Sequence, residues 1–241
     1  DGFVIEDNLE RDYDGLTRGV LVQPFVNAHI SNNSIDGGTS SYASFGVALW
    51  NAGVVEIVDN EIEAGHGTTA YGVQVYAAST LLKKNRIRAS TEGLAIGISV
   101  YFESTAQIVW NEVRLGNRSQ TVALQVEDGS SATLIGNVLD VGFAGASGNH
   151  VANLTGEGTV TFINNHLLSG SDDEALGILS SKAHLDLINN IISAVTPLSL
   201  IGGTVSLRSN LWEAPNACFF RVQHHCASSL ELEACSFSGC A

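Results

Sequence analysis

The stretch EIVDNEIEAG, residues 56–65, places an asparagine between two short runs in which apolar and polar residues alternate. The chain repeats this arrangement, for example as LKKNRIRAS at 82–90, IVWNEVRLG at 108–116 and LIGNVLDVG at 134–142. Aligned on the asparagine, the repeats define slots 20 to 28 residues apart: Asn8, Asn33, Asn60, Asn85, Asn111, Asn137, Asn165, Asn190 and Asn210, with Cys235 in a tenth slot. Internal repeats of this length indicate a solenoid.

Apolar residues take the same places around each slot. Ile, Leu or Phe stands three residues before every slot, and from the second slot on an apolar residue stands two residues after it. The alternation predicts two short strands, and its change of phase predicts a bend at the asparagine, which tolerates the left-handed backbone region. About 12 residues after most slots another strand begins, usually with glycine, as in GVAL at 46–49 and GVQV at 72–75. Each repeat therefore predicts three strands and three turns.

Strands this short cannot bury themselves, but coils stacked about 4.8 Å apart pair equivalent strands into parallel sheets. The apolar positions then fill a narrow core, and stacked asparagines satisfy their amides through the coils above and below. The sequence therefore predicts an all-β chain that forms a parallel β-helix of about ten coils, with three short parallel sheets and an internal asparagine ladder. We expect residues 1–217 to form the repeats and residues 218–241 a Cys-rich last coil or cap of the same domain.

The repeat resembles the right-handed parallel β-helix of the pectate-lyase-like superfamily, and the resemblance covers essentially the whole chain. It implies a right-handed coil, an asparagine ladder in the turn between the second and third sheets, and a binding groove on the first sheet, which the glycine-led strands open. It implies no particular activity, because this scaffold hosts lyases, hydrolases, epimerases, adhesins and phage fibres.

Composition restricts the partners. The net charge is −14, from 25 acidic and 11 basic residues, and such a surface repels phosphate backbones, so we expect no nucleic-acid partner. No apolar run approaches the roughly 18 residues of a membrane span. Because Met is absent and the first repeat starts in mid-pattern, we expect a processed chain or a piece of a longer one.

All four cysteines, Cys218, Cys226, Cys235 and Cys240, lie in the last 24 residues. An even number at one end predicts a disulfide-stapled terminus, with the pairing left open, and hence a secreted or cell-surface protein.

The first sheet should carry an outward row of aromatic residues, Trp50, Tyr76 and Tyr101, on consecutive coils, beside a row that includes Gln74 and Gln125. Sugar rings have apolar faces and hydroxyl rims, so a flat platform of rings with amide edges suits a glycan. These five residues are the ligand-binding candidates. The alternative is an aromatic ladder that only stabilises the sheet by stacking. We expect Arg221 to be the only basic residue of this sheet.

The outward residues of the other two sheets predict two further surfaces. Outward charges of mostly alternating sign on the third sheet, such as Glu61, Arg86 and Glu112, predict cross-strand ion pairs rather than a catalytic row. An apolar stripe outside the second sheet, interrupted by Lys83, should not face water in a lone monomer, so we expect a loop, a partner or a second copy to cover it. Its members are Val58, Val109, Ile135, Ile163 and Ile188.

Signals of catalysis are few. Gly65-His66-Gly67 resembles the GHG of polygalacturonase-type hydrolases, but no paired aspartates precede it, and Gly65 already belongs to the repeat. The catalytic candidates are His66, Glu103 and Glu127.

An acidic turn is the candidate metal site. Clustered carboxylates suit Ca²⁺, although such a run is more often a solvated loop. The run consists of Asp172, Asp173 and Glu174.

The leading functional hypothesis is a secreted or cell-surface scaffold or adhesin-like domain that contacts glycans through its aromatic row. Two alternatives stay open: a polysaccharide lyase or glycoside hydrolase, and a self-assembling structural module.

Overall fold

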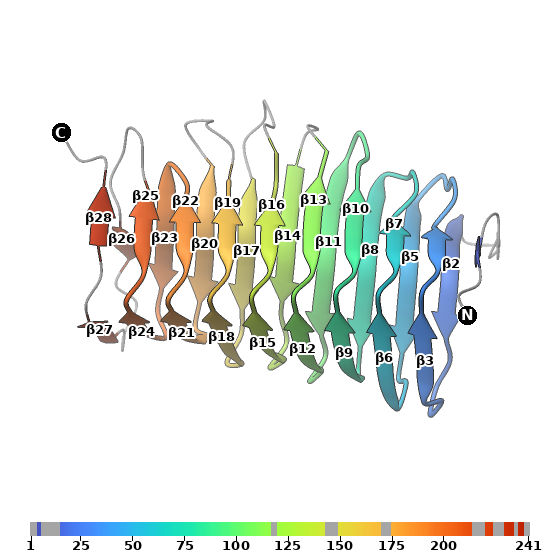
Figure 1. Ribbon diagram of the computed structural model, residues 1–241, viewed down its shortest axis with the longest axis horizontal. Coiled ribbons are helices and arrows are strands. Elements are labelled where there is room, and N and C mark those ends of the chain that lie inside the picture. The colour runs from blue at the N-terminus through green and yellow to red at the C-terminus, as the bar shows by residue number, and fades with distance from the viewer. Residues whose placement is uncertain are drawn as a thin grey trace.

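The computed structural model describes residues 4–5, 15–116, 120–142, 149–169, 175–213, 220–223, 229–233 and 236–238. Over these residues the chain winds repeatedly through three sheets, and each coil lies beside the next along one long axis (Figure 1). In this described part the sheets contain nine, nine and ten strands, and paired strands run parallel. The predicted all-β parallel β-helix with three parallel sheets is confirmed.

Each coil contributes one strand to each sheet. The first sheet consists of β2 (Leu16–Val22), β5 (Ala43–Trp50), β8 (Thr69–Tyr76), β11 (Leu94–Tyr101), β14 (Gln120–Val126), β17 (His150–Thr155), β20 (Leu176–Ser181), β23 (Thr196–Ile201) and β26 (Phe220–Gln223). The second sheet consists of β3 (Ala28–Ser31), β6 (Val54–Val58), β9 (Ser79–Lys83), β12 (Thr105–Val109), β15 (Ser131–Ile135), β18 (Thr159–Ile163), β21 (His184–Ile188), β24 (Thr204–Arg208) and β27 (Ser229–Glu233). The third sheet consists of β1 (Val4–Ile5), β4 (Ser34–Asp36), β7 (Glu61–Glu63), β10 (Arg86–Ala89), β13 (Glu112–Leu115), β16 (Val138–Asp140), β19 (His166–Leu168), β22 (Ile191–Ser193), β25 (Leu211–Glu213) and β28 (Ser236–Ser238).

The asparagine ladder lies inside the turn between the second and third sheets, and it is described from Asn33 to Asn210. In each step the side-chain amide donates to Oδ1 of the next asparagine, which also accepts the backbone N–H of the first. Asn85, for example, makes both bonds to Asn111 at 2.9 Å and donates a further bond to the carbonyl of Ile57 at 2.8 Å. The ladder therefore satisfies buried polar groups coil by coil, as predicted.

The bend differs from the prediction in one respect. The ladder asparagine does not have the left-handed backbone; the residue before it does, with φ between 53° and 66° in the eight repeats from Asn32 to Ser209. The reason is that the ladder residue must point inward and keep its own N–H on the neighbouring Oδ1. The chain therefore turns one residue earlier, at a side chain that is free to face outward.

The glycines that open the first-sheet strands let the third sheet approach closely. A Cβ on Gly46 would lie 2.4 Å from Cγ2 of Ile62, and one on Gly72 would lie 2.3 Å from Cγ2 of Ile87. Both isoleucines are fully buried. Glycine at these places therefore makes room for the isoleucine column of the facing sheet.

The predicted ion pairs lie on the outer face of the third sheet. Arg88 Nη1 contacts Glu61 at 2.9 Å and Glu63 at 3.2 Å, and Glu112 contacts Arg114 at 2.6 Å and Arg86 at 3.6 Å. The side chains are largely exposed, so this face is a solvated network of alternating charge.

All four cysteines and the acidic turn at 172–174 lie outside the described residues. Strands β26, β27 and β28 extend the three sheets into the last 24 residues. The disulfides and the cap at 218–241 stay predictions. Among the described residues, no helix is long and apolar enough to cross a membrane.

Candidate ligand-binding face

Strand register places Trp50, Tyr76 and Tyr101 next to one another at the ends of β5, β8 and β11. The ring centroids are 6.2 Å apart for Trp50 and Tyr76 and 5.0 Å apart for Tyr76 and Tyr101. The ring planes meet at 45° and 68°, so the row is present but the expected flat platform is not. The angle follows from packing, because aromatic neighbours at coil spacing prefer edge-on or offset contacts.

A fourth ring completes the exposed part of this row. Phe102, in the turn after β11, stacks on Tyr76 with centroids 4.8 Å apart and planes at 17°. Phe102 is 52% exposed and Trp50 40% exposed, whereas Tyr76 and Tyr101 are half-buried. The turn between the first and second sheets thus presents ring surface to solvent over three consecutive coils.

A second aromatic pair lies behind the row on the same outer face. Phe45 and Tyr71 are stacked 4.9 Å apart with planes at 6°. The guanidinium of Arg18, on β2, lies 5.6 Å from the Phe45 ring centre and 5.3 Å from the Trp50 ring centre, and Arg18 is only 4% exposed. Arg221 is therefore not the only basic residue of this sheet. We call the six rings of Phe45, Trp50, Tyr71, Tyr76, Tyr101 and Phe102 the aromatic face.

The two candidate glutamines lie on this face but are already engaged. Oε1 of Gln74 accepts the indole N–H of Trp50 at 3.1 Å, and Gln74 is only 5% exposed. Nε2 of Gln125 donates to Glu127 at 2.8 Å. These amides therefore orient Trp50 and Glu127.

Carboxylates border the aromatic face at the same turn. Glu103 and Asp128 are exposed and Glu127 is half-buried, and the Glu103 N–H donates to the Asp128 carbonyl at 3.0 Å. Burial, together with the neighbouring tyrosines and the charges of Asp128 and Glu127, raises the pKa of Tyr101 to about 12. Tyr101 therefore lies close enough to Glu127 and Asp128 to feel their charges.

The structure does not bring His66 near the other two catalytic candidates. His66 precedes β8, whereas Glu103 follows β11, and these paired strands run parallel and in register. Eight strand residues separate the two ends by roughly 25 Å, whereas the carboxyl pairs of glycosidases lie within about 10 Å. His66 instead lines a polar hollow of about 580 Å³ with Ser40, Thr68 and Glu92.

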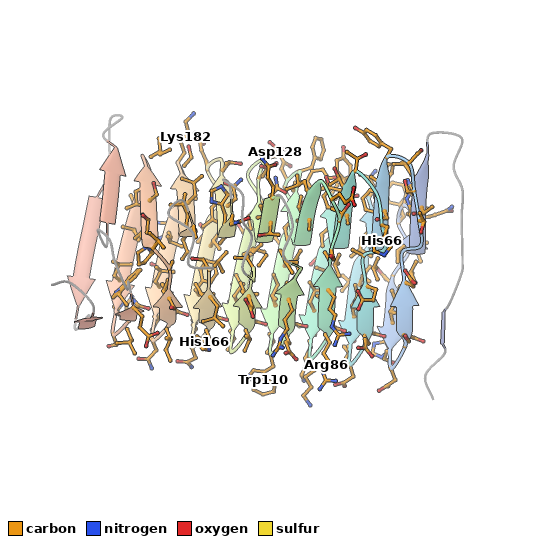
Figure 2. All side chains as sticks on the ribbon, turned by 90° about the horizontal axis from the view of Figure 1, so that it is seen from above. His66, Arg86, Trp110, Asp128, His166 and Lys182 are labelled. Atoms are coloured by element: carbon orange, nitrogen blue, oxygen red, sulfur yellow. The ribbon has the colours of Figure 1, made fainter. Side chains whose placement is uncertain are left out.

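The apolar stripe runs along the outer face of the second sheet. Val58, Lys83, Val109, Ile135, Ile163 and Ile188 are consecutive register partners, and all are partly exposed. Trp110, 57% exposed, lies beside the stripe, and its ring centre is 5.9 Å from Lys83 Nζ. Figure 2 shows Trp110 and Asp128 at opposite edges of the molecule, so the stripe and the aromatic face are separate surfaces.

A hollow of about 400 Å³ lies on the second sheet, and its lining includes Ser79, Thr105 and Ser131. No group of three or more His, Cys, Asp or Glu residues is placed to hold a metal ion within the described ranges. The Ca²⁺ expectation concerned residues outside those ranges.

The fold and this site define a parallel β-helix with an aromatic outer face. The family model for the right handed beta helix region matches residues 13–139, which are 127 of the 241 residues. The chain therefore belongs to the right-handed β-helix family, in agreement with the resemblance to the pectate-lyase-like superfamily. Comparisons with curated proteins and with solved structures return no match.

Proposed function

We propose that this chain is a secreted or cell-surface β-helix scaffold, adhesin-like in role, that binds a glycan along its aromatic face. The observation that carries this proposal is the exposed ring surface of Trp50 and Phe102 on either side of Tyr76. Sugar C–H faces pack against such rings, and sugar hydroxyls bond to polar groups at their border, here Glu127 and Glu103.

The geometry favours an extended chain over a single sugar. The ring row continues over three coils, about 10 Å along the helix axis at the spacing of paired strands. A polymer that lies parallel to that axis contacts one ring per coil. Each sugar then adds a small contribution to the binding free energy. The confinement of the cysteines to the last 24 residues supports an oxidising, extracellular location.

Binding without turnover is the role that the site favours. Of the three catalytic candidates, only Glu103 and Glu127 border the rings, and His66 lies at the far end of the strands. The enzymatic alternative, a lyase or glycoside hydrolase, would have to act through those two carboxylates.

A second role, self-association, is favoured by one observation. The stripe from Val58 to Ile188 forms a continuous, partly exposed apolar row on a surface separate from the aromatic face. Two copies in contact along this row would remove it from water.

The proposal is tested on a glycan array with the full chain and matched variants. Trp50→Ala and Tyr76→Ala should abolish binding to the polysaccharides that the unaltered chain retains. Trp110→Ala removes an even more exposed tryptophan from the opposite edge and should leave binding intact. The retained polysaccharide should show no new reducing ends and no unsaturated products. Turnover that Glu127→Gln removes would establish the enzyme instead, and binding unaffected by Trp50→Ala would overturn the proposed face.

A further inference from the structure

The aromatic face combines two kinds of group that both attract cations. Its rings present electron-rich surfaces, and its border carries the carboxylates of Glu103, Glu127 and Asp128. The hydrogen bond from Gln125 holds Glu127 in place, and the bond between the Glu103 N–H and the Asp128 carbonyl joins the two acidic turns. A ligand on the rings therefore lies beside negative charge, of which the Glu127 carboxylate is held by a hydrogen bond.

Among the described residues, Arg18 and the arginines of the third sheet are already engaged with other side chains. The guanidinium of Arg18 lies over the rings of Phe45 and Trp50, and Arg18 is only 4% exposed. The arginines of the third sheet, Arg86, Arg88 and Arg114, lie on another outer face, in contact with glutamates of that face. The chain as a whole carries a net charge of −14.

These charges select among glycans. A uronate polymer would bring its carboxylates against Glu103, Glu127 and Asp128 and be repelled. A protonated amino sugar offers an apolar ring face to the aromatic rings and an ammonium group to the ring faces and carboxylates. A basic peptide fits less well, because a lysine ammonium stands at the end of a flexible stem that loses rotamer freedom on binding.

Resting on the proposed function of the aromatic face, we infer that its ligand is an amine-bearing glycan, an oligomer or polymer of unacetylated amino sugar.

The test measures binding of the full chain by calorimetry in mildly acidic buffer, in which amino sugars are protonated. Four probes of equal length are compared: glucosamine oligomers, their N-acetylated counterparts, galacturonate oligomers and oligolysine. We expect the glucosamine oligomer to bind at least about tenfold more tightly than the acetylated one, with a preference that weakens as salt is added.

Two variants keep the test independent of folding. Asp128→Asn retains a residue that tolerates the left-handed backbone (φ 53°), and Glu127→Gln retains the shape of the side chain. In each variant, the dissociation constants of the glucosamine oligomer and of its N-acetylated counterpart should become more nearly equal. Glu56→Gln removes an exposed carboxylate from the second sheet and should preserve the ratio.

The outcomes separate this inference from the proposed function. Equal binding of acetylated and unacetylated oligomers, or tighter binding of galacturonate, overturns the amine preference and leaves a glycan-binding face. Binding of oligolysine alone overturns both, and binding of none of the four probes overturns the amine preference and leaves the glycan-binding face to the array.

Discussion

Oδ1 of Asn111 accepts two hydrogen bonds from Asn85 on the preceding coil, one from its backbone N–H and one from its side-chain amide, each 2.9 Å long. Both residues are at most 2% exposed. The amide of Asn111 in turn donates to the carbonyl of Leu82 at 2.9 Å and to Asn137 at 3.1 Å. One side chain thus satisfies groups on both neighbouring coils, which neither Asp nor Ala could do.

Replacing this residue should be costly. Asn111→Ala leaves the Asn85 N–H and the Leu82 carbonyl buried without these partners, so we expect a loss of about 3–5 kcal/mol in the free energy of unfolding. Denaturant titration of the variant and the unaltered chain measures this difference in the free energy of unfolding. Arg88→Ala, which removes exposed ion pairs only, should cost about 1 kcal/mol or less. Equal costs for the two variants would contradict the role assigned to the ladder.

The close approach of the first and third sheets gives a second prediction. In Gly72→Ala the new Cβ meets Cγ2 of Ile87 at 2.3 Å and the Gly97 carbonyl at 2.5 Å, so we expect destabilisation of about 2–4 kcal/mol. Gly129→Ala meets nothing within 4 Å and only strains a left-handed backbone, with φ +71°, at about 1–2 kcal/mol. Thermal unfolding of both variants compares them, and the opposite order would be evidence against this packing.

Stability at alkaline pH should depend on Tyr101. Because its pKa is raised to about 12 in the folded chain, against an ordinary value of 10.0, folding favours the neutral phenol. The stability that Tyr101 contributes is fully present below pH 10 and is lost as the pH rises from 10 through about 12. The reason is that the phenol of the unfolded chain releases its proton first. Tyr101→Phe should therefore flatten the fall in denaturant midpoint over that range, whereas Tyr42→Phe, at a 66% exposed position, should not.

Self-association gives a prediction about mass in solution. If copies join along the apolar stripe, Ile135→Asp places a charge in the middle of the contact and should lower the mass measured by light scattering. Lys84→Asp, at an exposed position outside the stripe, serves as the control and should leave the mass unchanged. The same mass before and after Ile135→Asp would remove self-association from consideration.

The periodic part of the fold could be predicted because each coil repeats the same inward positions. The ladder, the charge columns of the third sheet and the row from Trp50 to Tyr101 all follow from that register. The backbone of the bend could not be predicted by counting. Whether the ladder asparagine or its predecessor turns the chain depends on where the next Oδ1 accepts its hydrogen bonds.

The rest of the aromatic face was missed for a related reason. Phe45 packs on the outer face of the first sheet, yet Val47, two residues later, lies in the main core. The alternation of inward and outward side chains changes phase at Gly46, between them. Simple alternation therefore assigns Phe45 to the wrong face, together with Arg18, its register partner. Phe102 lies in a turn, where no periodicity applies. Only the structure shows that its ring is exposed beside Tyr76.

Tryptophan fluorescence during titration with the glycan shows whether Trp50 lies in the binding surface. Trp50 lies on the aromatic face, Trp110 lies at the opposite edge, and Trp212 is fully buried. We predict that Trp110→Phe keeps the spectral change on glycan binding and that Trp50→Phe loses it. A change that persists in Trp50→Phe and disappears in Trp110→Phe would contradict the account and place the ligand beside the apolar stripe.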